Sequence, residues 1–362
     1  MEKLSLYTDN NSFLIHTERT DLPKLRIACQ EKTEFFEKIS PTTWKITGRQ
    51  LNLLHNAVNK NRLFLYYTDN KQEINASRFE IDLGQTTALI VDEKTFYGYV
   101  SLEHNVRFVT EQLPSAKSYY QKSHPLEIKA TENKVKLKIA IETKYAALTE
   151  TNLIISNRQE GHKFNVFSTK IETSKIQPNI YQNICTFLFS SEEFLNTLRP
   201  TLNYNDFDAT LFDFYLTFCI KQTPITNYKF RVPFSKEIKT EIWCPYPSKK
   251  MFLLYCYQTV YGNLSARIGI ISKEIYKEYC SLLKTAKTKS NNNIVLICEY
   301  PHKAQDNGLF FFQYLMEKQN KFIPYYIISE NSKDLFNLRP YMEHVVYFKS
   351  KKHLKLLFEA NY

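Results

Sequence analysis

The segment KVKLKIAIET at residues 134–143 alternates between apolar and charged side chains, and this period of two strongly limits how it can fold. In an extended chain its apolar residues point to one side, namely Val135, Leu137, Ile139 and Ile141. Its lysines point to the other side, namely Lys134, Lys136 and Lys138. A chain with one apolar and one charged side is typical of a half-buried antiparallel strand.

Neighbouring segments repeat the pattern and predict hairpins. LEIKAT at 126–131 is separated from the first strand only by Glu132 and Asn133, which favours a tight turn. The segment at 152–167 predicts a second hairpin, in which Gly161 takes the positive φ of the turn.

Residues 1–270 read as strands throughout, and an internal repeat divides them. RFEIDL at 78–83 resembles KFRVPF at 229–234, and LIVDEKTFYGYVSL at 89–102 resembles LLYCYQTVYGNLSA at 253–266. The shared core contains the pairs Tyr97-Gly98 and Tyr261-Gly262. The repeat predicts two related β-sandwich-like domains, at 1–118 and 119–270, and the strand spacing suits an immunoglobulin-like sandwich. Chance similarity between tyrosine-rich strands is the alternative.

The pattern changes to a helical period at residue 272. SKEIYKEYCSLLKTAK at 272–287 places Ile275, Tyr279, Leu282 and Leu283 on one stripe. Such a helix packs on its own domain or lies on a membrane surface. With the polar KTKSNNN at 287–293, it makes 271–293 a helix and linker.

Alternating strands and helices follow in residues 294–362. Apolar strands are predicted at 294–298, 322–328 and 344–348. Helices are predicted at 307–320, 332–338 and 350–360, with Asn307, Ser332 and Ser350 as N-caps. This β-α-β-α-β-α order is the opening of a doubly wound, Rossmann-like sheet. The predicted fold class is therefore multidomain, with two β domains before an incomplete α/β domain.

Composition excludes several kinds of site. The chain has only 7 glycines and neither GxGxxG nor GxxxxGK[ST], so no glycine-rich phosphate loop is expected. Its 7 cysteines include no CxxC pair, which favours free thiols in a reducing cytosol. No Cys/His cluster has ligand spacing, so neither a metal nor a cofactor is predicted. The N-terminus lacks a signal-peptide core and no run of about 18 apolar residues occurs, so we expect a soluble or peripheral protein.

The formal net charge of +11 favours an anionic partner. Residues 271–362 hold 14 Lys+Arg against 9 Asp+Glu, giving +5, and residues 1–270 carry the other +6. Phospholipid headgroups, a phosphate polymer and nucleic acid all fit this charge, as does a generally basic protein without such a partner. Since no RNA-recognition or zinc-finger pattern is present, we expect no nucleic acid partner.

The stretch 294–362 resembles the CDP-glycerol glycerophosphotransferases, the teichoic acid primases and polymerases of Gram-positive bacteria. Those enzymes begin a glycosyltransferase-like domain with a strand ending in Glu, a polar loop, an Asp-Asn pair and a helix. The residues that fit are Glu299, Asp306, Asn307, Leu309, Tyr314 and Leu315. The later strands fit at 324–328 and 345–347, followed by the basic segment 349–357 and the strand start Ala360-Asn361-Tyr362.

The resemblance covers about 69 of the 362 residues and departs from the family in two respects. The family's Gly- or Ser-rich loop is replaced by PHKAQ at 301–305. The family's catalytic histidine segment and its donor-binding second domain would lie beyond Tyr362. The sequence therefore predicts the N-terminal half of a GT-B-type domain, truncated and without a catalytic residue.

Family membership implies transfer of a polyol phosphate from CDP-glycerol or CDP-ribitol to a lipid-linked teichoic acid chain. It implies a histidine general base, departure of CMP, and work at the inner face of the cytoplasmic membrane. A CDP-polyol donor is expected only if the domain is completed. The candidate substrate-binding residues are Glu299, His302, Lys303, Asp306 and Asn307. The candidate membrane or polymer contacts are Lys349, Lys351, Lys352 and Lys355.

Each candidate residue also has a structural explanation. Glu299 can hydrogen-bond the next loop, Asp306-Asn307 can cap a helix, and the lysines can form a solvated helix face. The chain is therefore expected to be a cytoplasmic, peripheral teichoic acid biosynthesis protein that is inactive alone. The alternative is a non-catalytic module that binds an anionic polymer or glycan.

Overall fold

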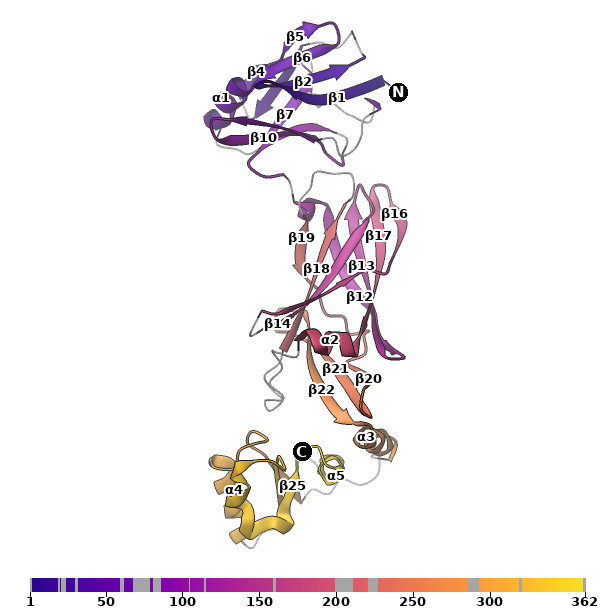
Figure 1. The fold of residues 1–362 in the computed structure, drawn as a ribbon, viewed down its shortest axis with the longest axis vertical. Helices are drawn as coiled ribbons and strands as arrows, with labels where there is room; N and C mark the ends of the chain where they lie inside the picture. Colours follow the sequence, from indigo (N-terminus) through magenta and orange to yellow (C-terminus); the bar gives the residue numbers. More distant parts are fainter. Residues whose placement is uncertain are drawn as a thin grey trace.

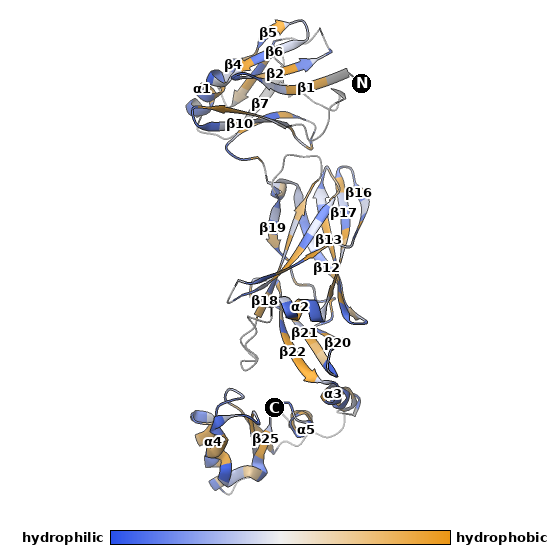
Figure 2. Cartoon of the chain, in the orientation of Figure 1, coloured by the Kyte–Doolittle hydropathy of each residue, from blue (hydrophilic) through white to orange (hydrophobic). Residues whose placement is uncertain are grey.

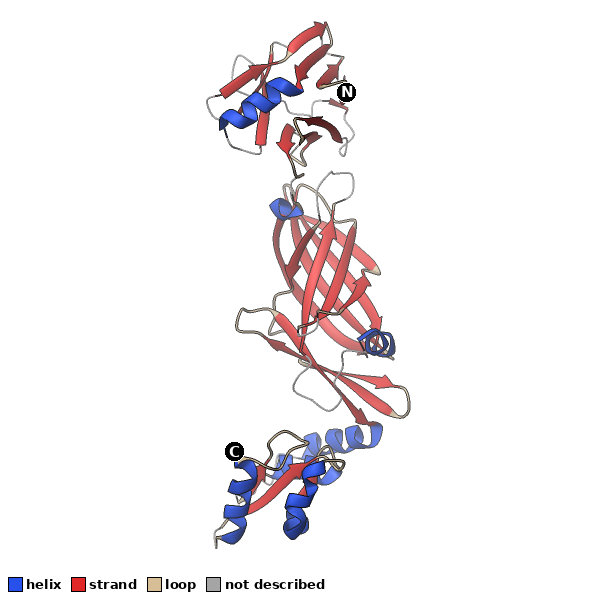
Figure 3. Ribbon diagram, turned by 60° about the vertical axis from the view of Figure 1, so that its left-hand side comes forward, coloured by secondary structure: helices blue, strands red, loops and turns tan. Residues whose placement is uncertain are grey.

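The computed structural model describes residues 2–18, 20, 24–29, 32–58, 62–67, 79–80, 86–103, 105–113, 115–158, 161–198, 211–220, 227–285, 293–318 and 321–360. They form an elongated, β-rich molecule of several sheets (Figure 1). An N-terminal part (2–113) lies at one end and a middle sandwich (115–272) follows it. A C-terminal part (293–360) lies at the other end, where most of the helices gather (Figure 3).

The N-terminal part consists of two sheets and one helix around a single core. The sheets have the orders β5-β6-β2-β1-β8 and β4-β3-β7-β11-β10-β9. Their strands are β1 (Glu2–Asp9), β2 (Ser12–Thr17), β3 (Leu25–Cys29), β4 (Lys32–Phe35), β5 (Glu37–Ser40), β6 (Thr43–Thr47), β7 (Arg62–Tyr67), β8 (Phe79–Glu80), β9 (Thr86–Val91), β10 (Lys94–Val100) and β11 (Val106–Thr110). Phe13 and Phe108 meet edge-to-face in the core, with ring centroids 5.2 Å apart. The helix α1 (Gly48–Val58), which the sequence analysis did not predict, buries Leu51 and Leu54 against the same core.

The middle sandwich packs a four-stranded sheet, β12-β13-β17-β16, against a seven-stranded one, β15-β14-β18-β22-β21-β20 with β19 beside β18. Its strands are β12 (Tyr120–Thr131), β13 (Lys134–Lys144), β14 (Glu150–Asn157), β15 (Lys163–Phe167), β16 (Lys170–Gln177), β17 (Ile180–Ser190), β18 (Leu211–Cys219), β19 (Tyr228–Arg231), β20 (Glu241–Tyr246), β21 (Lys250–Gln258) and β22 (Leu264–Ser272). Hydrophobic and hydrophilic residues alternate along most of these strands (Figure 2), because one side of each faces the core, whereas the edge strand β16 is largely exposed. A short helix, α2 (Ser191–Leu198), closes one end and was also not predicted.

The predicted strand and hairpins of this sandwich are confirmed. Strand β13 buries all four of the apolar side chains that its period of two had singled out. Thr131 pairs with Lys134, so Glu132 and Asn133 form the turn of the β12–β13 hairpin. Strands β14 and β15 pair as the second hairpin, and Gly161 has φ +72°.

The residue equivalences proposed for the internal repeat are wrong. Tyr97 and Gly98 lie within strand β10, whereas Tyr261 and Gly262 lie in the turn between β21 and β22. Gly262 has φ +76°, which a turn requires. Residues 78 and 81–83 of the other matched segment lie outside the described residues. The shared letters thus reflect tyrosine-rich composition rather than equivalent positions.

The C-terminal part has a three-stranded parallel sheet in the order β23-β24-β25. Its elements are β23 (Ile294–Ile297), α4 (Asn307–Glu317), β24 (Ile323–Ile328), the 3₁₀ helix η4 (Lys333–His344), β25 (Val345–Tyr347) and α5 (Lys351–Glu359). The three predicted strands and the caps Ser332 and Ser350 are confirmed. The cap of α4 is Asp306 rather than Asn307, and the segment after Ser332 is a kinked 3₁₀ helix containing Pro340. Proline removes a backbone donor, which disfavours a regular α-helix there.

Helix α3 (Lys273–Thr285) packs on its own chain, which is one of the two alternatives given in the sequence analysis. The rings of Tyr276 and Tyr279 lie 5.0 and 5.7 Å from that of Trp243 in β20. Tyr279 also faces Phe358 of α5 at 6.1 Å, so α3 contacts both neighbouring parts. Leu283 of the predicted stripe remains 52% exposed. No helix in the described ranges has the length and apolar character needed to cross a membrane.

Candidate functional site

The loop after β23 is organised by the carboxylate of Glu299. Oε1 accepts hydrogen bonds from the backbone N–H groups of Asp306 (3.0 Å) and Leu309 (2.9 Å). Oε2 accepts one from the N–H of Gln305 at 3.3 Å. Asp306 in turn accepts the N–H of Asn307 at 2.8 Å and caps α4. Both acidic residues therefore hold the start of α4, where free N–H groups and the helix dipole favour negative charge.

Gly308 is part of the same arrangement, although the sequence analysis did not single it out. A Cβ atom at this position would lie 2.7 Å from Cγ of Glu299 and 3.0 Å from its Oε1. Real Cβ atoms do not come so close, so the bound carboxylate requires glycine here. The sequence signal was present as a glycine directly after Asp306-Asn307.

The PHKAQ loop is pinned to the segment that begins η4. Ser332 donates its hydroxyl to the carbonyl of His302 at 2.6 Å. Asp334 accepts the N–H of Ala304 at 3.0 Å, and Asn337 donates to the Ala304 carbonyl at 2.7 Å. These contacts fix the loop backbone at the carboxyl end of the parallel sheet, where ligands of open α/β sheets bind.

The side chains of His302 and Lys303 gather around Tyr300, which is 55% exposed. The rings of Tyr300 and His302 stack with centroids 6.0 Å apart, and Lys303 Nζ lies 5.4 Å from the Tyr300 ring centroid. Below them the Tyr326 hydroxyl donates to the Lys303 carbonyl at 3.1 Å. Burial, followed by the nearby charge of Glu299, raises the pKa of Tyr326, so this phenol stays protonated. The loop thus presents one aromatic and two basic side chains.

The four lysines predicted to contact a membrane or polymer have separate partners within the chain. Lys349 donates to the Ile270 carbonyl at 3.1 Å, and Lys351 pairs with Glu274 of α3. Lys352 lies 5.2 Å from the Tyr325 ring centroid, and Lys355 lies 3.8 Å from Glu359. Lys351 and Lys355 keep side-chain exposures of 53% and 64%, whereas Lys349 points into the junction with β22. The structure therefore separates Lys349 from the other three.

Burial lowers the pKa of Lys349 to about 8. Since the unfolded lysine titrates near 10.4, the unfolded state binds more protons between about pH 8 and 10, and stability should rise with pH in that window. We expect the wild-type chain to gain about 1–2 kcal/mol relative to Lys349→Met from pH 8 to 10. Urea unfolding of both proteins at each pH measures this difference. A constant difference would show that Lys349 titrates normally.

A second polar cluster, which the sequence analysis missed, lies on the outer face of the seven-stranded sheet. Asp213 of β18 is 5% exposed. Arg158 donates to both of its oxygens at 3.1 and 2.7 Å, and Arg231 donates to Oδ1 at 2.9 Å. Ser265 of β22 donates to the same Oδ1 at 2.7 Å. The cluster is a buried carboxylate beneath two partly exposed guanidinium groups, whose side chains are 40% and 25% exposed.

Burial by itself would raise the pKa of Asp213. The hydrogen bonds from Arg158 and Ser265 and the charges of the two arginines outweigh this effect, and the pKa lies below its ordinary value. Asp213 is therefore ionised at neutral pH.

More cations surround this cluster on the same face. Lys229 Nζ and the Arg231 guanidinium carbon lie 4.4 and 5.0 Å from the Tyr215 ring centroid. Arg267 lies 5.8 Å from the ring of Tyr257. Residues 119–270 hold 19 Lys+Arg against 13 Asp+Glu, so the +6 that the sequence analysis assigned to 1–270 belongs to this segment.

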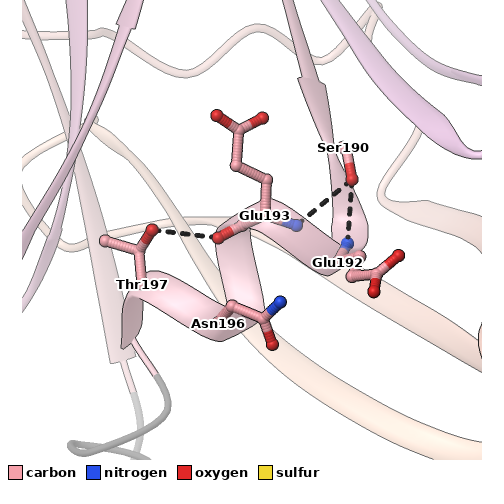
Figure 4. Close-up of a pocket in the computed structure, with 5 residues that line it drawn as sticks. All are labelled: Ser190, Glu192, Glu193, Asn196 and Thr197. Atoms are coloured by element: carbon pink, nitrogen blue, oxygen red, sulfur yellow. Dashed lines mark hydrogen bonds between the residues drawn. The ribbon is translucent and has the colours of Figure 1, made fainter.

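A shallow hollow at the start of α2 is lined by Ser190, Glu192, Glu193, Asn196 and Thr197 (Figure 4). The Ser190 hydroxyl accepts the N–H groups of Glu192 and Glu193 at 3.1 and 3.2 Å, so it caps the helix. Thr197 donates back to the Glu193 carbonyl at 3.0 Å. The helix end is thus satisfied internally, and two carboxylates make the hollow unsuitable for an anion.

The described residues assemble no metal site, and several of their thiols are buried. No group of three or more His, Cys, Asp or Glu side chains in the described residues could hold a metal ion. The six cysteines whose side chains are described carry free thiols, and three of them are buried: Cys185, Cys244 and Cys256. Burial raises the pKa of these three thiols, which makes them unreactive.

Comparison with known proteins places few constraints on the chain. No protein-family model matches it, and no curated protein does. Among solved structures the chain is similar to Staphylococcus aureus TarS, with 16% sequence identity and a TM-score of 0.29. The alignment covers 52% of this chain and 30% of the TarS chain. It therefore spans less than a third of TarS.

Proposed function

We propose that this chain acts in teichoic acid synthesis, and that its C-terminal part corresponds to the Rossmann-like N-terminal half of a polyol-phosphate transferase domain. The observation that supports this proposal most is the bonding of Glu299 to the start of α4. The resemblance rests on a Glu, a polar loop and an Asp-Asn pair, and their spacing in this chain lets one carboxylate bind the N–H groups of Asp306 and Leu309. The parallel strand order β23-β24-β25 agrees with such a domain.

The candidate residues take different roles under this proposal. Glu299, Asp306 and Asn307 shape the loop and the helix start rather than touch a substrate. His302 and Lys303, gathered around exposed Tyr300, meet a phosphate of the acceptor chain. Lys351, Lys352 and Lys355 face anionic headgroups or polymer at the inner face of the membrane, whereas Lys349 serves the junction with β22.

Two histidines of the C-terminal part have a ring nitrogen bonded within the chain. His344 Nδ1 lies 2.8 Å from the Pro324 carbonyl oxygen. His353 is buried, and its Nδ1 accepts the Lys349 N–H at 3.0 Å. His302 stacks on the exposed ring of Tyr300, and we assign it to binding the acceptor. The described residues are therefore proposed to position an acceptor rather than to catalyse transfer.

Two measurements test the proposal. Deletion of the coding gene should lower the phosphate content or the polymer length of purified cell walls, and unchanged walls would contradict a role in teichoic acid synthesis. The purified chain should release no CMP from CDP-glycerol or CDP-ribitol with a lipid-linked acceptor. Release above the enzyme-free blank would overturn the non-catalytic assignment.

A further inference from the structure

We propose that the outer face of the seven-stranded sheet binds a phosphodiester-linked polyol polymer. The residues that form this arginine face are Arg158, Lys163, Tyr215, Lys229, Arg231, Tyr257 and Arg267, with Asp213 and Ser265 beneath them. The identity of the polymer rests on the proposed function. The binding site itself rests on the geometry of the sheet.

Strand register brings these residues to one face. Asp213 pairs with Ser156 of β14 and Ser265 of β22, and Ser156 pairs with Lys163 of β15. Ser265 pairs with Tyr257 of β21, which extends the same row across five strands. At about 4.8 Å per strand spacing this row is about 19 Å long, enough for several charged repeats.

A second row lies directly beside the first. Tyr215, two residues after Asp213, pairs with Ile154 of β14 and Arg231 of β19. Lys229 projects from the same side of β19 as Arg231 because side chains alternate along a strand. Lys163 and Arg231 lie in these two rows, and Arg158 and Lys229 lie beside them. Arg267 lies in a further row, which also contains Glu241 of β20.

Asp213 preorganises the two arginines at the centre of the face. Its two oxygens and the Ser265 hydroxyl fix both guanidinium groups, which lowers the conformational entropy that a ligand would otherwise have to remove. Guanidinium groups match phosphate oxygens with paired N–H donors, whereas an ammonium group acts as a point charge. Burial, and then the nearby charge of Lys163, lower the pKa of Lys229, which shows that these two ammonium groups lie close together on this face.

The aromatic rings argue for phosphate recognition rather than stacking of nucleobases. Proteins that bind single-stranded nucleic acid stack bases on exposed aromatic rings. Here Lys229 and Arg231 lie over the Tyr215 ring, and Arg267 lies over Tyr257. The rings therefore support the cations, and the face offers charge and hydroxyl groups to a flexible polyanion.

The outer face of the four-stranded sheet provides a natural control. It is also rich in lysine, but Lys129 pairs with Glu127, Lys170 with Glu172, and Lys122 with Glu142. Carboxylates thus alternate with the lysines there, and no buried carboxylate gathers arginines. Removing three positive charges from one face or from the other therefore distinguishes binding at a specific site from attraction to the overall positive charge of the protein.

The test compares two triple variants of the full-length chain by isothermal titration calorimetry with purified poly(glycerol phosphate) and poly(ribitol phosphate). Lys163→Gln/Lys229→Gln/Arg267→Gln should weaken binding at least tenfold at about 50 mM salt. Lys136→Gln/Lys138→Gln/Lys170→Gln should change it less than twofold. Wild-type binding should weaken steeply at 300 mM salt, because the partners are joined mainly by charge. Circular dichroism and thermal unfolding establish whether both triple variants are folded. If the triple variant of the arginine face does not fold, the single variant Lys229→Gln replaces it and should weaken binding about threefold.

Several results would overturn the site. These are equal losses in both triple variants, no wild-type binding at low salt, or tighter binding of single-stranded RNA of equal charge than of either polymer. Neutral dextran should not bind. Failure of the proposed function can be distinguished from failure of this site. If gene deletion leaves the cell walls unchanged while binding still depends on the arginine face, the biosynthetic role is wrong and the binding site stands.

Discussion

Replacing Asp213 by alanine should lower the free energy of unfolding of the middle sandwich by about 3 kcal/mol, because it removes the buried partner of two arginines. Arg158, Arg231 and Ser265 would each lose a hydrogen-bond acceptor at 2.7–3.1 Å. Both arginines are partly exposed, so water recovers some of the loss. Urea unfolding followed by circular dichroism measures the change.

The matched control is Glu172→Ala in the same sandwich. Glu172 pairs with Lys170 at 2.7 Å, but both side chains are exposed, and such pairs contribute little. We expect a small change at Glu172. If alanine at Asp213 costs no more than alanine at Glu172, the cluster does not stabilise the sheet.

The stabilising effect of Asp213 can also be measured from the pH dependence of the free energy of unfolding in acid. The pKa of Asp213 is lower in the folded than in the unfolded chain, so its contribution is complete above the unfolded value near 3.9. The contribution is lost as the pH falls through the lower, folded value. Asp213→Asn should therefore flatten the part of the wild-type stability curve below about pH 4.

Local periodicity predicted much of the fold. Strand β13, both hairpins, helix α3 and the parallel strands of the C-terminal part follow from patterns within 10–15 residues. Helices α1 and α2 were missed because each lies among strands. The mistaken match of Tyr97-Gly98 with Tyr261-Gly262 arose because a shared Tyr-Gly pair does not specify whether a chain continues as a strand or turns.

The candidate sites depended on contacts between distant residues. Arg158 lies 55 residues from Asp213 and 107 from Ser265, so no window of the sequence brings this cluster together. Lys349 and Lys351 are neighbours in sequence, yet their partners lie 79 and 77 residues away in β22 and α3. Residues close in sequence thus had different roles, and the arginine face depends on strand order.

The role of Glu299 could be narrowed from the sequence but not decided without the structure. Its place after a buried strand was evident, but both a binding and a structural role fitted the sequence. The structure assigns its oxygens to backbone N–H groups of the next loop and helix. Because charge-assisted hydrogen bonds of this kind are strong, Glu299→Ala should destabilise the C-terminal part by about 2–3 kcal/mol.

The effect of Gly308→Ala on the free energy of unfolding should change sign with the residue at position 299. With Glu299 present, the new Cβ would lie 2.7 Å from its Cγ, so the carboxylate must move and lose its hydrogen bonds. We expect a loss of about 1–2 kcal/mol. With Glu299→Ala present the obstructing side chain is gone, and alanine should stabilise the helix by about 1 kcal/mol over glycine.

A double-mutant cycle of the four proteins, unfolded in urea, gives a coupling energy of about 2–3 kcal/mol if Glu299 holds the helix start. Hydrogen exchange at the Asp306 and Leu309 amides should accelerate in Glu299→Ala and in Gly308→Ala. If Gly308→Ala has the same sign in both backgrounds, Glu299 does not occupy this position. It would then be available to a ligand, and the binding role left open by the sequence would regain support.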